Sequence, residues 1–170
     1  MPLSLVGSEM CIRDRDNNYG NSVAITDTYF IVGAYVYDGV NSNIGRAYVY
    51  KISDYINDID GTNNNADDSK ALIFTGENEV NNYYGTSVAI TDNYVIVGAS
   101  GYNSSEGRVY VYKISDYNFG TNYNADDSKA LIFTGEDEIG KYYYGNSVAI
   151  TDNYFIVGAY GYNFNEGRVY

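Results

Sequence analysis

One stretch of seventeen residues decides the fold: YGNSVAITDTYFIVGAY, at positions 19–35, occurs three times with few changes. The second copy, YGTSVAITDNYVIVGAS, occupies positions 84–100, and the third, YGNSVAITDNYFIVGAY, occupies positions 144–160. The intervals between the copies are 65 and 60 residues. A period of this size indicates a repeat architecture, in which each unit buries its apolar faces against its neighbours.

Each repeat unit is predicted to contain four short strands. Large and small side chains alternate at the start, so that Val23 and Ile25 share one face while serine and alanine share the other. TDT or TDN then makes a tight turn, because Asp and Asn tolerate positive φ. The next strand is nearly all apolar, which predicts that both of its faces are covered. In the first unit the predicted strands are residues 22–26, 29–34, 46–53 and 71–75.

The repeat pattern predicts an all-β fold. No segment shows sustained helical periodicity, and four antiparallel strands in about 60 residues are typical of a β-propeller blade. A solenoid is the competing architecture. The units are predicted at 16–76, 77–135 and 136–170. The last copy ends at GRVY, where the second continues as GRVYVYKISDY. We therefore expect tandem four-stranded antiparallel blades in a partial, open propeller, with a truncated third unit.

The first fifteen residues resemble nothing else in the chain. The stretch LVGSEMCIRDR at 5–15 matches the translation of a transposase-type sequencing adaptor, so residues 1–15 are interpreted as a non-native addition. The alternative is a short signal peptide, but the segment lacks a basic start and its apolar run is too short. The only cysteine, Cys11, lies here and cannot form an internal disulfide.

Composition argues against several kinds of function. With 10 basic and 22 acidic residues, the net charge of −12 is unsuited to a nucleic-acid partner, since phosphate backbones bind Lys and Arg. No apolar run approaches the roughly 20 residues that span a bilayer. The absence of histidine removes the usual general base and the commonest metal ligand. The chain is therefore predicted not to be an enzyme.

The polar residues that resemble catalytic groups are predicted to be structural. Ser22, Ser87 and Ser147 recur in the repeated block, and no histidine can activate them. The carboxylate pairs at 67–68 and 126–127 lie beside lysines in polar segments. Solvated, partly paired loops are expected there instead of an acid/base pair.

One acidic loop imitates a calcium-binding pattern. In INDIDGTNNNAD, at 56–67, Asp58 and Asp60 precede Gly61 and Asp67 closes the loop. Ile56 stands at the first ligand position and cannot coordinate, and the equivalent loop of the second unit lacks both leading acids. A Ca²⁺ site at Asp58, Asp60 and Asp67 stays open as a hypothesis beside a flexible acidic loop; no other cofactor is expected.

The order of these motifs resembles the bacterial form of the FG-GAP repeat, in which an aromatic-Gly pair precedes SVA, then VGA, then GxAYVY. Tyrosine stands here for the phenylalanine, and the proline that follows Gly-Ala in the family is absent. The family's calcium loop between the first two strands is shortened to TDT or TDN, so that site cannot be carried over. The matching positions are Tyr19, Gly20, Gly33, Ala34, Tyr84, Gly85, Gly98, Ala99, Tyr144, Gly145, Gly158 and Ala159.

The resemblance implies blades of an integrin-like β-propeller of a secreted or cell-surface protein. We expect a non-catalytic binding or scaffold module whose protein or glycan ligand binds at variable loops such as Asp38–Asn43 and Tyr102–Glu106. The alternative is an accessory propeller of a larger enzyme whose catalytic domain lies outside this sequence. Missing blades of the same chain are the expected partners of the open end faces, so the isolated chain is expected to aggregate or oligomerise.

Overall fold

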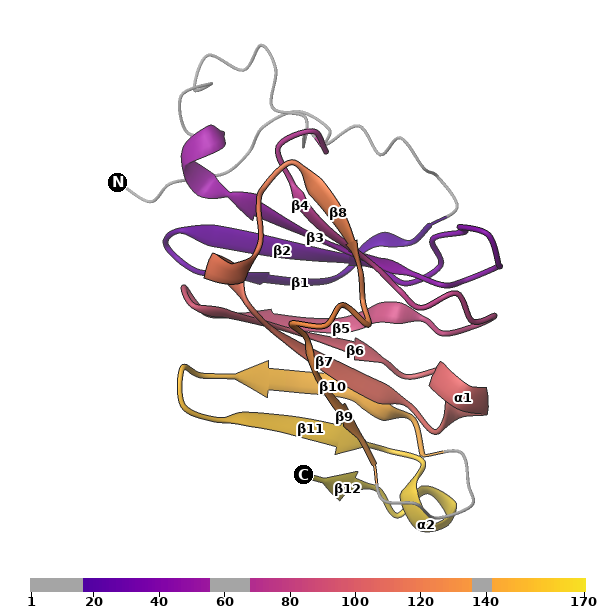
Figure 1. Ribbon diagram of the computed structural model, residues 1–170. Coiled ribbons are helices and arrows are strands. Elements are labelled where there is room, and N and C mark those ends of the chain that lie inside the picture. Colours follow the sequence, from indigo (N-terminus) through magenta and orange to yellow (C-terminus); the bar gives the residue numbers. More distant parts are fainter. Residues whose placement is uncertain (1–16, 56–67, 136–141) are drawn as a thin grey trace.

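The computed structural model describes residues 17–55, 68–135 and 142–170, and in them three β-sheets are stacked one above another (Figure 1). Each sheet is formed mainly by one copy of the repeat, and neighbouring strands within a repeat pair antiparallel. The three sheets do not close into a barrel, which confirms the predicted all-β class and the open arrangement of blades. Within the described residues no helix is long and apolar enough to cross a membrane.

The first sheet follows the predicted order of strands. It contains β1 (Tyr19–Ile25), β2 (Tyr29–Ala34), β3 (Arg46–Lys51) and β4 (Leu72–Thr75). The third strand ends two residues earlier than predicted, because Ile52–Asp54 forms the 3₁₀ turn η1. Ile52 N–H donates to the Thr28 carbonyl at 2.9 Å, which turns the chain over the β1–β2 turn.

The second and third sheets repeat this plan. The second contains β5 (Tyr84–Ile90), β6 (Tyr94–Ala99), β7 (Arg108–Lys113) and β9 (Leu131–Thr134), with the 3₁₀ turn η2 at Ile114–Asp116. The third contains β10 (Tyr144–Ile150), β11 (Phe155–Ala159) and β12 (Arg168–Val169). Two four-residue turns, α1 (Tyr102–Ser105) and α2 (Tyr162–Asn165), precede β7 and β12 and include left-handed backbone.

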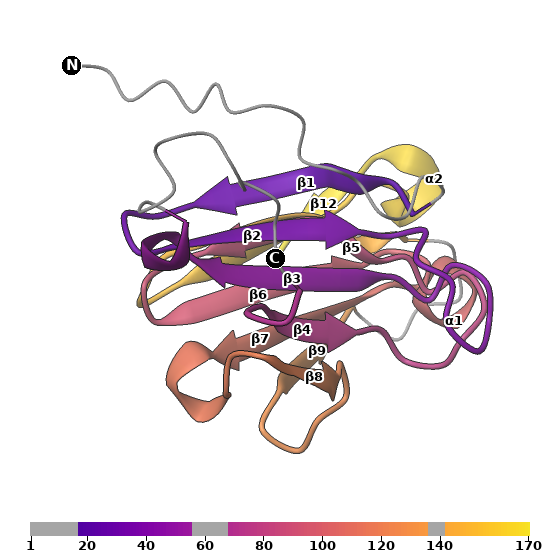
Figure 2. The same ribbon diagram turned by 90° about the horizontal axis from the view of Figure 1, so that it is seen from above.

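A fifth strand corrects the prediction of four antiparallel strands per blade. The segment expected as a polar loop of the second unit forms β8 (Thr121–Asn124), which pairs parallel with β4 of the first sheet. Figure 2 shows β8 at the edge of that sheet opposite β1. The Tyr123 ring lies 6.3 Å from that of Phe74, and Gly120 N–H donates to the Ala71 carbonyl at 2.7 Å. The pairing covers an edge that a four-stranded blade would leave open.

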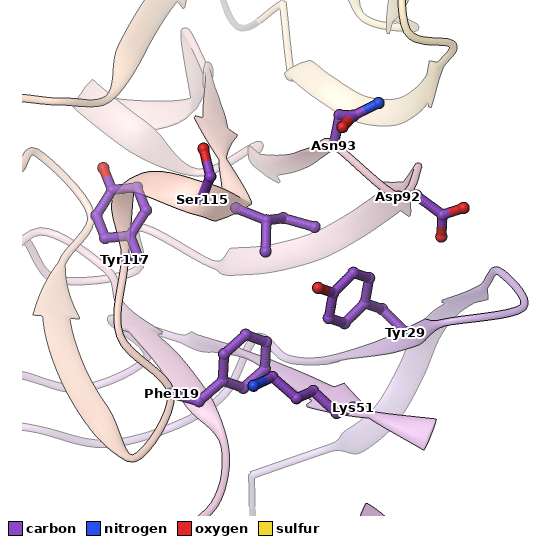
Figure 3. Close-up of a pocket in the computed structure, with 8 residues that line it drawn as sticks. Tyr29, Lys51, Asp92, Asn93, Ser115, Tyr117 and Phe119 are labelled. Carbon is purple, nitrogen blue, oxygen red and sulfur yellow. The ribbon is translucent and has the colours of Figure 1, made fainter. Parts of the chain in front are cut away.

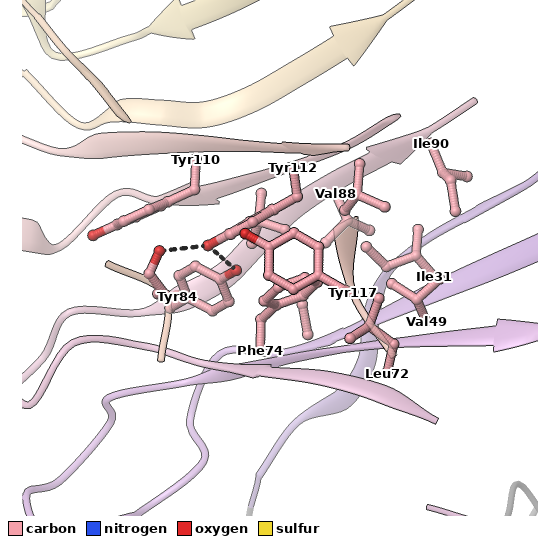
Figure 4. Packing of buried hydrophobic residues seen from close by; sticks show 14 of the residues in the cluster. Ile31, Val49, Leu72, Phe74, Tyr84, Val88, Ile90, Tyr110, Tyr112 and Tyr117 are labelled. Atoms are coloured by element: carbon pink, nitrogen blue, oxygen red, sulfur yellow. Dashed lines mark hydrogen bonds between the residues drawn. The ribbon is translucent and has the colours of Figure 1, made fainter. Parts of the chain in front are cut away.

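The core lies between the sheets, as the alternation of side chains predicts. Val88 and Ile90 of β5 point toward the first sheet and pack in a cluster with Ile31 and Leu72 (Figure 4). On the other side of the second sheet, Ile96 packs in a cluster that includes residues of β10 and β11. The second strands of the first two blades are therefore buried on both faces, as their apolar sequence predicts, whereas Ile156 on the second strand of the third blade is 55% exposed.

Candidate functional site

The junction between neighbouring blades uses the serine of each SVA motif. The Ser22 hydroxyl donates to the Gly85 carbonyl at 2.7 Å, and the Ser87 hydroxyl donates to the Gly145 carbonyl at the same distance. Each bond joins one blade to the glycine of the next blade's Tyr-Gly pair. The two serines therefore act as connectors between blades, and nothing about their surroundings resembles an activated nucleophile.

Two glycines of each repeat make this close junction possible. Gly85 and Gly145 have φ of +89° and +84° and lie at a β-bulge, where the register of β5 against β6 and of β10 against β11 shifts. Glycine is the residue that adopts this backbone at little cost. In the preceding blade, a Cβ atom added to Gly98 would lie 1.9 Å from the Gly145 carbonyl oxygen. Only hydrogen at that position lets the next bulge approach.

The tyrosine of each Tyr-Gly pair lies against the YVY stretch of its own blade. The rings of Tyr84 and Tyr110 meet edge to face at 5.2 Å, and equivalent pairs occur in the other two blades at 5.4 and 5.1 Å. The Tyr84 hydroxyl donates to that of Tyr112 at 2.8 Å, and Tyr112 donates to the Ala125 carbonyl at 2.8 Å (Figure 4). A phenylalanine at position 84 would leave the buried Tyr112 oxygen without that donor.

Burial changes the acidity of these phenols. Loss of solvent raises the pKa of Tyr84 and of Tyr112 well above its usual value, and both side chains are fully buried. Burial likewise raises the pKa of Tyr19 and of Tyr144 to about 12. These hydroxyls stay protonated at neutral pH and serve as hydrogen-bonding groups of the core, so none of them is poised as a general base.

The predicted motif positions come together at these junctions. In each blade the tyrosine and the glycine after it open the first strand, and the Gly-Ala pair closes the second strand, directly across from them. Tyr19–Ala34, Tyr84–Ala99 and Tyr144–Ala159 are partners in the register. The remaining members of the set occupy equivalent places: Gly20, Gly33, Gly85, Gly98, Gly145 and Gly158.

The candidate calcium ligands Asp58, Asp60 and Asp67 lie outside the described residues. Across residues 17–55, 68–135 and 142–170, no group of three or more acidic side chains is placed to hold a metal ion. The described carboxylates that follow the candidate loop and its equivalent accept hydrogen bonds from tyrosines. Tyr50 donates to Asp68 at 3.1 Å, and Tyr117 donates to Asp127 at 3.2 Å.

A pocket of about 250 Å³ opens between the first two blades (Figure 3). It lies at the end of the strands that carries the tight turns. The Tyr29 and Phe119 rings are stacked, with centroids 5.8 Å apart and planes 13° from parallel, and the Lys51 ammonium lies 4.4 Å from the Phe119 ring centroid. The other lining residues are Asp92, Asn93, Ile114, Ser115 and Tyr117.

The loops expected to bind a ligand lie at the opposite end of the strands. Tyr29 pairs with Lys51 at the pocket end of the first sheet, whereas Ala34 pairs with Arg46 at the end where Asp38–Asn43 lies. Polar side chains of this loop hold the segment leading into the second blade. The Asn41 amide donates to the Asn78 side chain at 2.9 Å, and the Asn43 amide donates to Asn81 at 2.8 Å.

The second of these loops is also tied to that segment. Asn103 N–H donates to the Glu79 carboxylate at 3.0 Å, and Arg108, just after the loop, forms an ion pair with Glu77 at 2.6 Å. The Arg108 guanidinium also lies over the Tyr102 ring, 3.5 Å from its centroid. Both loops therefore hold the segment of residues 77–81 that leads into the second blade.

Comparison with known families agrees with this arrangement. The family model described as FG-GAP repeat matches residues 14–50 and 70–112. These two segments are FG-GAP repeats. FG-GAP repeats form β-propeller-type repeat modules that are not themselves enzymes, and they typically occur in extracellular proteins. The third copy, at 144–160, differs from the second at three of seventeen positions. No curated protein matches the chain.

Sequence reasoning identified the residues of the FG-GAP motif but not the contacts that they make. The repeat periods of 65 and 60 residues do not by themselves predict that a serine hydroxyl of one blade donates to a carbonyl of the next. That hydrogen bond can be inferred only when the stacking of the sheets is known. The pocket was also missed, because Tyr29 and Phe119 are far apart in sequence and belong to different units. A usable signal was present: in FGTNYN at 119–124, Phe119, Thr121 and Tyr123 alternate with glycine and asparagine, which is a period-2 pattern typical of an exposed strand.

Proposed function

We propose that this chain is a non-catalytic binding or scaffold module, part of a larger secreted or cell-surface β-propeller, and that it holds a protein or glycan ligand. One observation carries the proposal: the repeated polar groups that could have served chemistry are engaged in hydrogen bonds within the fold. Ser22 and Ser87 bond to the next blade, and the tyrosine hydroxyls bond to one another. The surface of the fold is the part that stays available for binding a ligand.

The inter-blade pocket is the place where we expect a ligand. Its stacked rings offer an apolar face, while Lys51, Asp92 and Asn93 offer a cation, an anion and an amide beside it. A sugar ring or a single side chain of a protein has such mixed character. The volume of about 250 Å³ is smaller than the ~300–1,000 Å³ of sites that enclose a whole small ligand. A projecting group of a larger ligand fits it better.

The two variable loops are a weaker choice of binding surface. Asn41, Asn43 and Asn103 are already engaged with the segment that joins the first two blades. A ligand that captured these groups would have to displace hydrogen bonds within the protein. A ligand that contacts the pocket rings would not have to displace such hydrogen bonds, so we favour the pocket as the binding surface.

The test is a glycan and peptide array probed with the whole chain and with pocket variants. Phe119→Ala removes the stacked ring, and Lys51→Ala removes the cation. Lys113→Ala is the matched control, because Lys113 ends β7 as Lys51 ends β3 but does not line the pocket. Loss of a signal in both pocket variants, with the control unchanged, supports the proposal. An array signal equal in all three variants would refute the pocket as the ligand site.

A further inference from the structure

The third repeat is the only one of the three that carries a tyrosine at both of two neighbouring positions. One position precedes the Tyr-Gly pair and is occupied in turn by Asn18, Tyr83 and Tyr143. The other follows the Gly-Ala pair and is occupied in turn by Tyr35, Ser100 and Tyr160. Since β10 begins and β11 ends at a register pair, Tyr143 and Tyr160 lie side by side just beyond that pair.

The Tyr143 and Tyr160 rings are stacked almost in parallel. Their centroids are 4.7 Å apart and their planes are 10° from parallel, which is the geometry of two rings in contact. Partial burial and then the Tyr143 hydroxyl raise the pKa of Tyr160, so the two hydroxyls lie at the same end of the stack. The ring carbons next to one hydroxyl are therefore close to those next to the other.

The stacked pair is open to solvent. Tyr160 is 51% exposed and Tyr143 is partly exposed. Tyr35, the counterpart of Tyr160 in the first blade, is also only partly buried, although Tyr83 of the following blade packs against it. Access to this position therefore does not depend on the presence or absence of a blade after the third.

The other pairs of tyrosine rings among the described residues lack either the parallel contact or the exposure. Two stacked pairs are almost completely buried: Tyr48 with Tyr50 and Tyr110 with Tyr112. The Tyr142 and Tyr162 rings are inclined by 39°, and the remaining pairs meet edge to face. Within this part of the chain, Tyr143 and Tyr160 alone present two parallel, exposed phenol rings in contact.

We propose that Tyr143 and Tyr160 form an oxidative cross-linking site, at which a peroxidase supplied with hydrogen peroxide joins the two rings as dityrosine. Each phenol loses one electron and its hydroxyl proton and becomes a phenoxyl radical. The two radicals form a carbon–carbon bond between ring positions next to the hydroxyls, and the hydrogen on each of these carbons moves to the oxygen of its own ring. The two electrons and two protons released reduce one hydrogen peroxide to two water molecules.

The cross-link closes the β10–β11 hairpin covalently at its open end. It ties the segment that enters the third blade to the residue that follows β11. Because the two rings are already held in contact, coupling within the pair is favoured over coupling between copies of the chain. The site lies at the opposite end of the strands from the pocket, so it is independent of the proposed ligand binding.

The test is mass spectrometry of the whole chain after treatment with a peroxidase and hydrogen peroxide. Cys11 is alkylated beforehand so that its thiol does not consume the oxidant. Trypsin and an endoproteinase that cleaves before aspartate then separate residues 142–151 from residues 152–168. In monomeric protein these two peptides are expected to stay joined, with a mass lower than their sum by two hydrogen atoms. The yield should not change with protein concentration, because both rings belong to one chain.

Three variants assign the cross-link to the two residues, and circular dichroism checks that each is folded. Tyr143→Phe keeps the ring but removes the hydroxyl that must be oxidised, and Tyr160→Ser introduces the residue that the second blade has at this position. Each is expected to lower the yield of joined peptides about tenfold, whereas the matched control Tyr142→Phe leaves it unchanged. A wild-type chain without joined peptides, joined peptides that persist in Tyr143→Phe, an equal loss in Tyr142→Phe, or dityrosine found only between copies would each overturn the proposal.

Discussion

Gly98 tests how closely the second and third blades are packed. The substitution Gly98→Ala places a Cβ atom 1.9 Å from the Gly145 carbonyl oxygen and 2.4 Å from the Ser87 hydroxyl. Real Cβ atoms essentially never approach another atom within 3.0 Å, so the two sheets must separate by about 1 Å. The backbone on both sides is held in paired strands, which leaves no cheap way to relieve the contact.

The expected cost follows from two terms. Overpacking of a well-packed interior costs about 1–3 kcal/mol. Loss of the buried hydrogen bond between Ser87 and Gly145 costs about 1 kcal/mol more. The free energy of unfolding is therefore expected to fall by about 2–4 kcal/mol, a large part of the roughly 5–15 kcal/mol that stabilises an ordinary domain. Because 1 kcal/mol shifts the Tm of a chain of this size by about 2–4 °C, the Tm should fall by on the order of 10 °C.

Gly158→Ala is the matched control, because it makes the same change at the equivalent position of the third blade. A Cβ atom there meets only Ser147, whose hydroxyl lies 2.3 Å away and is free to rotate. The φ of Gly158 is not in the left-handed region, so alanine should be neutral or stabilise by up to about 1 kcal/mol through the unfolded chain. Urea titration followed by circular dichroism, at a concentration where the chain is monomeric, measures both variants. Equal midpoints for the two would refute the steric reasoning.

Four further predictions test other parts of the structure. Tyr112→Phe should lower the free energy of unfolding, measured by thermal melts, by about 1–3 kcal/mol, because it leaves the Ala125 carbonyl and the Tyr84 hydroxyl without their partner. Tyr154→Phe is the control: Tyr154 is 78% exposed, so this change should leave the free energy of unfolding the same. Stability should be constant from neutral pH up to the tyrosine pKa of the unfolded chain, about 10, and fall steeply toward pH 12, because burial raises the pKa of Tyr19 and Tyr144 to about 12 in the folded state. Urea midpoints that stay constant from pH 9 to pH 12 would contradict this. Ser104→Gly should raise the Tm by a few degrees, since Ser104 has φ of 61° between two other left-handed residues and glycine relieves about 1 kcal/mol of strain; an unchanged Tm would argue that this turn is unstrained. Calcium should bind no tighter than about 10⁻³ M by calorimetry, and a tighter site that disappears in Asp60→Ala would establish the 56–67 loop as a ligand.

The sequence predicts the repeated part of the fold well, because the alternation of side chains along each strand is a local pattern and the same pattern recurs in every repeat. Val23 and Ile25 follow the pleat of a strand, and the apolar run of β2 requires cover on both faces. The same reasoning gives the all-β class and the order of the strands. These inferences depend on neighbours along the chain, and local patterns carry that information.

The contacts between units depend on tertiary packing, which local patterns do not reveal. β8 was expected as a loop because its TNYN letters are polar, yet pairing with β4 and contact between Tyr123 and Phe74 outweigh that tendency. The pocket likewise requires Tyr29 and Phe119 to meet across ninety positions. The period-2 pattern at 119–124 indicates a strand but does not place Phe119 beside Tyr29.

The crossing of β8 onto the first sheet has a consequence for how the chain folds. The edge of β4 is completed only by residues 121–124, which follow almost the whole second blade in sequence. During synthesis, the β4 edge of the first blade therefore stays unpaired until most of the second blade has emerged from the ribosome. Each sheet is then not an independent folding unit, and the smallest piece able to fold cooperatively is a pair of adjacent blades. Any fragment that ends before Thr121 will present the β4 edge to other chains as a template for pairing.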